Sequence, residues 1–211
     1  MNHLTTLIDG LFEASKLESD STCSDRDSCV REILKSSATV AQSAVILANN
    51  QHSYAMAILA RPILENLINL CWLILSRDNA ITYINNYKFE LQKILKINIE
   101  NGNASIFDKN GNKVNFIDEF TKYKKPPSIA DKAKIANISE IYDIFYRTLC
   151  LNTHGNIDIS KSNEDLNTNN DTDIYIKAIG ALIMSIGHVS VNWLLYRNIT
   201  NKNTLADLLN I

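Results

Sequence analysis

An arginine and a histidine seven positions apart, Arg147 and His154, are the residues of this chain whose types and spacing best suit chemistry. Seven residues of an α-helix turn through about 700°, so the two side chains share one face of a helical segment. Helical side chains lean toward the N-terminus, which tilts His154 toward Arg147. Such a pair could flank a group the size of a phosphate, with the long arginine side chain curling back.

The chemistry that this pair supports is RNA cleavage without a metal ion. A neutral imidazole can take the proton of a ribose 2′-hydroxyl, or an imidazolium can protonate the leaving 5′-oxygen, while a guanidinium holds the phosphate. Acid–base catalysis contributes roughly 10² to 10⁴ in rate, and a preorganised charge donor roughly 10² to 10³. The spacing also arises by chance, with Arg147 a solvated surface residue and His154 only the end of a helix, and both interpretations stay open.

A second group of charged residues lies in the most apolar part of the chain, in the run A-R-P-I-L-E-N. Arg61 and Glu65 are four residues apart and face the same way on a helix. Charges within an apolar helix are costly unless they are paired, so an internal ion pair is the simpler interpretation. The functional alternative places one of them at the cleft of His154, where Glu65 orients the imidazole or Arg61 adds a second phosphate contact.

Long helices must position all of these residues. Apolar residues recur at helical spacing and predict long helices over about 4–17, 25–49, 52–76, 79–99 and 172–197. Ser24 and Ser128 are predicted N-caps, and Ser139 is expected to cap a helix that ends near His154. The chain has only 6 glycines and 3 prolines, which also favours an all-α, antiparallel helical bundle in a single domain spanning 1–211.

Two segments interrupt the helical pattern. Apolar residues alternate around Asn110-Gly111, which predicts a small hairpin or loop excursion near 103–118, within an insertion at 103–125. The polar run 156–171, rich in Asn and Asp, is predicted to be a flexible loop.

The third predicted helix, about 52–76, is apolar nearly all round, which is typical of the central helix of a bundle. It is long enough to span a bilayer, but Arg61 and Glu65 within it favour a buried helix. Pro62 is expected to kink it because proline donates no backbone hydrogen bond. The fourth helix is amphipathic, and these side chains are predicted to pack in the bundle: Ile81, Ile84, Tyr87, Phe89, Leu91, Ile94 and Leu95.

The composition limits the classes of partner and site. A formal net charge of −2 predicts no broad attraction to polyanions, so any contact with RNA is expected to be local. The 4 cysteines form no C-x-x-C pair, and neither a metal nor another cofactor is expected. Met1 to Asp20 mixes charged and apolar residues, which predicts no signal peptide and a cytoplasmic protein. His188, among apolar residues, is predicted to lie in the core.

The segment I-Y-D-I-F-Y-R-T-L-C-L-N-T-H has the form R-x6-H and resembles the R-x4-to-6-H motif of the HEPN superfamily (higher eukaryotes and prokaryotes nucleotide-binding). Together with A-R-P-I-L-E-N it is similar to a HEPN-like bacterial family of unknown function, in which an inner-helix R-x3-E precedes a Y-x-x-L-x(4)-H segment. Tyr146, Leu149 and His154 match that segment. The resemblance covers residues 30–197.

The resemblance implies a helical-bundle ribonuclease or nucleotide-binding domain, often dimeric and often part of a toxin–antitoxin or phage-defence system. In HEPN nucleases the arginine and histidine of two subunits meet at a shared cleft. By this resemblance Arg147 would bind phosphate and His154 would act as acid or base. The predicted supporting residues are Arg61, Glu65, Tyr146 and Thr148. The resemblance further implies RNA as the substrate, a homodimer, an antitoxin or defence-system partner, and no membrane.

Thr148 leaves a second function open. It stands where active members often carry Asn, Asp or His, so a non-catalytic helical dimer that binds a nucleotide or a partner protein is the alternative. A third hypothesis is a small-molecule pocket between the central helix and the Tyr146 helix. Aromatic residues at helical spacing are more often core, and the predicted lining consists of Tyr54, Trp72, Tyr83 and Tyr146.

Overall fold

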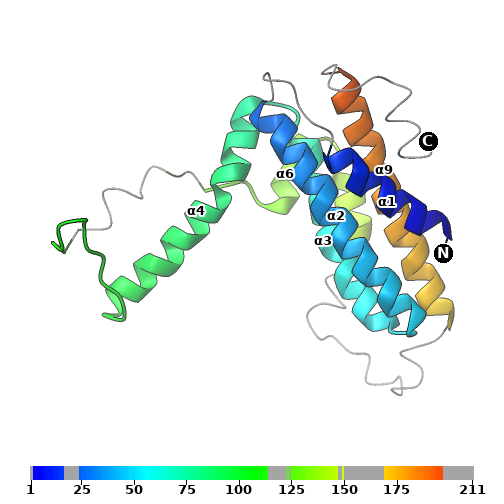
Figure 1. Cartoon of the computed structure of the whole chain (residues 1–211), viewed down its shortest axis with the longest axis horizontal. Coiled ribbons are helices and arrows are strands. Elements are labelled where there is room, and N and C mark those ends of the chain that lie inside the picture. Colours follow the sequence, from blue (N-terminus) through cyan, green and yellow to red (C-terminus); the bar gives the residue numbers. More distant parts are fainter. Residues whose placement is uncertain are drawn as a thin grey trace.

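The structure is a computed structural model of the whole chain, and it describes residues 2–16, 24–113, 123, 125–146, 149 and 169–196. Within these ranges the elements are helices, and the only extended pairing described is an isolated bridge (Figure 1). This confirms the predicted all-α bundle.

Four long helices build the bundle: α1 (Asn2–Lys16), α2 (Asp25–Asn49), α3 (Ser53–Leu73) and α9 (Asn169–Tyr196). α3 packs against α2 and α9, while α1 lies across α2 and α9 (Figure 1). Their facing stripes are apolar, and burying that surface is what drives the helices together. The centre of the core contains Val30, Ile33, Leu34, Ile63, Leu64, Ile68, Ile179, Ile183 and Ile186.

The predicted N-caps at Ser24 and Ser128 are both confirmed as capping boxes. The backbone N–H of Asp27 donates to Ser24 Oγ at 3.3 Å, and the backbone N–H of Ser24 donates to Asp27 Oδ2 at 2.8 Å. Ser128 and Asp131 repeat the arrangement at the start of α6 (Ile129–Ile135). Asp27 is also fully buried and accepts a hydrogen bond from Trp193 Nε1 at 2.8 Å, which ties α2 to α9.

The segment before Arg147 differs from the prediction. Ser139 is the first residue of α7 (Ser139–Ile141) and not its cap; the chain turns at Asn137, whose φ is 58°, and Ile138 is the capping residue. After one turn the chain widens into a π-helix, η1 (Tyr142–Tyr146). π-turns are rare and occur frequently at functional sites, because the extra residue per turn displaces side chains from the α-helical positions.

The helix α4 (Arg77–Glu100) starts in the bundle and then leaves it. Its first part packs on α2 and α3, and the rest projects away as an arm (Figure 1). The prediction that its apolar residues pack in the bundle is therefore wrong for the outward positions: Ile81, Ile84, Tyr87 and Ile94 are exposed. No other described helix runs beside the outer part of α4 to cover them.

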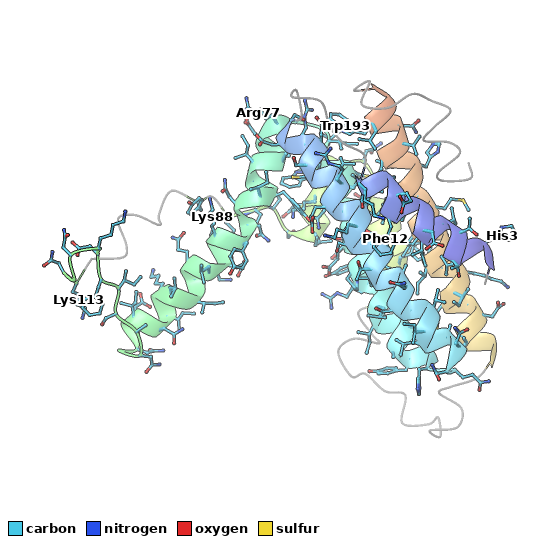
Figure 2. All side chains as sticks on the ribbon, in the orientation of Figure 1. His3, Phe12, Arg77, Lys88, Lys113 and Trp193 are labelled. Carbon is cyan, nitrogen blue, oxygen red and sulfur yellow. The ribbon has the colours of Figure 1, made fainter. Side chains whose placement is uncertain are left out.

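The arm ends in a tight turn at the predicted excursion. Gly111 has a φ of +82°, its N–H donates to Asp108 O at 3.0 Å, and an antiparallel bridge pairs Phe107 with Lys113. Figure 2 shows Lys113 at the outer end of the arm, far from Trp193 in the bundle. The turn at Asn110-Gly111 is thus confirmed up to residue 113, and the rest of the predicted excursion, 114–118, lies outside the described residues.

Two helices are long and apolar enough to cross a membrane by length and composition, Tyr54–Leu73 and Thr172–Leu194. They pack against each other, and 56% and 33% of their most apolar windows are buried within this chain. α3 also contacts α4, α6 and η1, which confirms its predicted place at the centre of the bundle.

Two predictions about the last helix need correction. α9 begins at Asn169, so the last three residues of the predicted 156–171 loop are helical, while 156–168 lie outside the described residues. His188 is exposed and not a core residue. It follows Met184 by one turn on the outer stripe of α9, which faces away from α3.

Candidate functional site

The predicted supporting residues Arg61, Glu65 and Tyr146 meet in the structure, and we call these three the Arg61 cluster. Arg61 Nε donates to Glu65 Oε1 at 3.0 Å along α3. Arg61 Nη2 donates to the hydroxyl oxygen of Tyr146 at 2.9 Å, across 85 positions of sequence. One guanidinium therefore joins the central helix to the end of the π-helix.

Aromatic contacts hold the same guanidinium in place. The Arg61 carbon Cζ lies 5.1 Å from the centre of the Tyr146 ring, within the range of a cation–π interaction. Tyr142 stacks on Tyr146 with ring centres 4.7 Å apart and planes at 20°. The π-helix thus gives Arg61 a two-ring support in addition to a hydrogen-bond acceptor.

The Arg61 cluster is only partly shielded from solvent. The side chains of Arg61 and Glu65 are 26% and 31% exposed. At this depth solvent screens an ion pair less than it does on the open surface. The net contribution of such a pair to stability is small, so its main effect is to fix the positions of the two side chains. The arrangement suits a positioning role, because Arg61 fixes Tyr146, the residue that immediately precedes the R-x6-H segment.

The two predicted catalytic residues, Arg147 and His154, lie outside the described residues, as does Thr148. Their described neighbours are Tyr146, which immediately precedes Arg147, and Leu149, which is buried in the core. The structure therefore brings three of the four predicted supporting residues together, and the role of Thr148 and the convergence of the catalytic pair stay predictions. The ion pair predicted for Arg61 and Glu65 is present.

Sequence reasoning missed a buried lysine beside this cluster. Lys132 of α6 is only 6% exposed; its Nζ donates to Asn69 Oδ1 at 2.8 Å and lies 4.8 Å from the Trp72 ring centre. Burial lowers the pKa of Lys132, and the nearby Glu65 carboxylate partly opposes that effect. A lysine in the first turns of a short capped helix gives no sequence signal of burial, which is why it was not found.

A pocket of about 520 Å³ opens between α3, α4 and residues 125–132. Glu65, Asn69 and Lys132 are among the residues that line it. Of the aromatic residues predicted to line a pocket, Tyr83 does so, but this pocket lies on the α4 side of α3 and not on the Tyr146 side. Glu65 belongs to both sites, since it lines the pocket and accepts the hydrogen bond of Arg61.

Comparison with known proteins gives one match. The model of a family of unknown function (DUF5677) matches residues 28–173, a range that includes the Arg61 cluster, the pocket and the R-x6-H segment. No curated protein and no solved structure matches the chain.

Proposed function

Since the chain belongs to the DUF5677 family, whose function is unknown, we propose its activity from its own residues: it is a metal-independent endoribonuclease of HEPN type. Arg147 and His154 are the catalytic pair of this proposal. The observation that carries it is the hydrogen bond from Arg61 to Tyr146, because it anchors the residue that leads into the R-x6-H segment. A chance spacing of arginine and histidine needs no such anchor.

The proposed reaction is an internal transesterification of RNA. The ribose 2′-oxygen attacks phosphorus as its proton leaves to a base, and the bond from phosphorus to the 5′-oxygen breaks as that oxygen gains a proton. His154 serves one of these proton transfers, and Arg147 offsets the added negative charge on the phosphate oxygens. The products are a 2′,3′-cyclic phosphate and a 5′-hydroxyl, and no metal enters the balance.

The Arg61 cluster acts as the positioning element in this proposal. Arg61 holds Tyr146 by its hydroxyl and by its ring, and Glu65 fixes the direction of the guanidinium. Misplacement of a catalytic group by about 1 Å can cost about 10²-fold in rate. Thr148, next to Arg147, supplies a hydroxyl that can donate to a phosphate oxygen.

The proposed active form is a homodimer in the cytoplasm, acting as a toxin or a phage-defence component. The exposed apolar residues of the α4 arm support a second copy as the partner. Ile84, Tyr87 and Ile94 are exposed, and with the half-buried Leu91 they follow one another at three- and four-residue steps, the spacing of a helix face that packs against another helix. Tyr87 is 74% exposed and Ile94 57% exposed in the single chain. Large exposed apolar side chains in such a row mark interaction sites.

The test is cleavage of an end-labelled RNA by the purified protein in EDTA, with mapping of the ends produced. We expect 2′,3′-cyclic phosphate ends from the wild type and a loss of at least about 10²-fold in rate from His154→Ala and from Arg147→Ala. His188→Ala and Arg77→Ala are matched controls, because these side chains are exposed and no described hydrogen bond or ion pair joins them to the Arg61 cluster. Cutting that persists in both catalytic variants would remove the pair from the mechanism.

The second candidate is a non-catalytic helical dimer that binds a nucleotide or a partner protein. The row of apolar side chains on α4 favours it as much as it favours the nuclease, because docking alone would use this row. Expression separates the two candidates. Growth arrest by the wild type, relieved by His154→Ala but not by His188→Ala, supports the nuclease; equal behaviour of all three supports the interaction module.

A further inference from the structure

We propose that the pocket between α3, α4 and residues 125–132 binds a small organic anion that carries a flat ring. The proposal does not depend on nuclease activity, because it rests on residues outside the R-x6-H segment. It rests on three properties of the lining: an apolar wall made of aromatic and proline rings, an excess of ammonium groups, and a volume that fits a small molecule.

The apolar wall is made of flat and rigid groups. Tyr83 and Phe89 come from α4, and Pro126 and Pro127 come from the segment that leads into α6. Aromatic rings and proline rings offer flat faces, and stacked or edge-on contacts with a ligand ring add about 0.5–1.5 kcal/mol beyond the buried area. The two prolines also fix the backbone of that side, so the wall needs little ordering when a ligand enters.

The charges of the lining leave a positive excess. Glu90 accepts from Lys93 Nζ at 3.1 Å, and Glu65 accepts from Arg61 Nε at 3.0 Å while its carboxylate also favours the charged form of Lys132. Lys125 and Lys132 are the remaining charged groups of the lining, and neither lies within ion-pair distance of a carboxylate among the described residues.

Lys132 is the stronger anchor of the two because it is buried. An ammonium group has three donors, and the contact with Asn69 uses one of them. A buried charge is costly until it is paired, and the burial that lowers the pKa of this amine expresses that cost. An anion in the pocket would pair with the ammonium group of Lys132 and reduce the free-energy cost of its burial.

The dimensions favour a small molecule over a macromolecule. About 520 Å³ lies within the range of small-molecule sites, roughly 300–1,000 Å³. Asn86 and Ser128 add neutral hydrogen-bonding groups at the rim of the same pocket. The shared chemistry is therefore a ring joined to a phosphate or a carboxylate, and the source of the anion is left to the choice of probes.

The test is isothermal titration calorimetry of the full-length protein with matched probes. Phenyl phosphate, adenosine monophosphate and benzoate each join a ring to an anion; inorganic phosphate and phenol supply one part only. We expect at least one joined probe to bind at least 10-fold tighter than both separate parts, at about 1 mM or below. The joined probe that binds tightest identifies the phosphate or the carboxylate source.

Two variants and a control assign the binding to this pocket. Lys132→Met keeps the apolar contact with Trp72 and removes the charge. Lys125→Gln removes the second charge at an exposed position. Each is expected to weaken the best probe at least 10-fold, while Lys109→Gln on the arm leaves it unchanged. Binding in the His154→Ala protein should match the wild type. Equal binding of the joined probes and inorganic phosphate, no binding at all, or full binding by Lys125→Gln and a folded Lys132→Met would overturn the proposal.

Discussion

The bundle and the α4 arm both carry apolar residues at helical spacing, but the two regions use them in opposite ways. In the bundle, the apolar stripes of α2, α3 and α9 are buried, as Ile33, Ile63 and Ile183 show. On the arm, Ile84 and Ile94 have the same helical spacing and remain exposed. Periodicity tells which residues share a face of a helix; it does not tell whether the element that covers that face belongs to the same chain.

The largest expected effect separates the two regions by stability. Leu64→Ala in the buried centre of α3 should lower the free energy of unfolding by about 2–5 kcal/mol, because it leaves a cavity. Ile94→Ala on the arm should change it by less than about 0.5 kcal/mol. Urea denaturation of both variants, at a protein concentration low enough to keep single chains, checks this. Similar losses in the two variants would mean that the arm is buried in solution.

The two capping boxes offer the next comparison, one buried and one exposed. Asp27→Ala removes the carboxylate that accepts from the Ser24 backbone N–H and leaves Trp193 Nε1 without its acceptor inside the bundle, so we expect a loss of about 2–3 kcal/mol in unfolding free energy. Asp131→Ala removes the equivalent side chain at the exposed start of α6 and should cost no more than about 1 kcal/mol. Thermal denaturation orders the two, and the reverse order would contradict the role assigned to Trp193.

The arm itself is tested by self-association. Ile94→Lys places a charge in the exposed apolar row, and we expect it to weaken dimers at least 10-fold while the unfolding free energy of the single chain stays unchanged. Lys96→Glu, two residues further along α4 and so on the opposite side of the helix, is the control for a change of charge on the arm away from the apolar row. Sedimentation velocity over a range of concentrations measures both. A dimer that survives Ile94→Lys would place the interface elsewhere.

The smallest effect concerns a thiol inside the bundle. Burial, with a smaller contribution from Asp25, raises the pKa of Cys29 from 9.0 to about 11. The folded state therefore keeps the proton that the unfolded state loses, so stability contributed by the neutral thiol is present below pH 9 and declines between about pH 9 and 11.

Alkylation followed by peptide mass spectrometry checks this at pH 8. Cys29 should react on the order of 10²-fold more slowly in the native protein than in urea, since the thiolate fraction falls with each unit of pKa. Cys29→Ser, which should reduce the slope of stability between pH 9 and 11, is the matched variant; burial also raises the pKa of Cys71 and Tyr83, so part of the slope remains. Equal reactivity in the two states would mean that the start of α2 is open.

Local sequence signals predicted the fold well where one helix decides its own structure. Ser24 and Ser128 are predictable as caps because each serine stands just before a helix, and the structure adds an acidic residue three positions later that closes a capping box. Asn110-Gly111 predicted its turn because the conformation of a turn also depends on a few neighbouring residues, here with Gly111 at a positive φ. The prediction of Ser139 as a cap was wrong because the chain turns at Asn137 and Ile138 caps the helix one residue earlier. The π-helix that begins at Tyr142 has no sequence signature in this chain.

The candidate site was predictable only in its parts. The four-residue step predicted that Arg61 and Glu65 would pair, but the contact of Arg61 with Tyr146 joins residues on separate helices. Lys132 looks like an ordinary surface lysine until α6 folds onto α3. Contacts between elements depend on how the whole bundle closes, and no local pattern encodes them.

The most direct measurement of the central claim is RNA cleavage in EDTA by a positioning variant and a catalytic variant compared side by side. If the Arg61 cluster positions the R-x6-H segment, Arg61→Leu and Tyr146→Phe slow the cut without changing the 2′,3′-cyclic phosphate ends, while His154→Ala abolishes it. Wild-type rates in Arg61→Leu and His154→Ala alike, or the absence of any metal-independent cut by the wild type, would contradict the account.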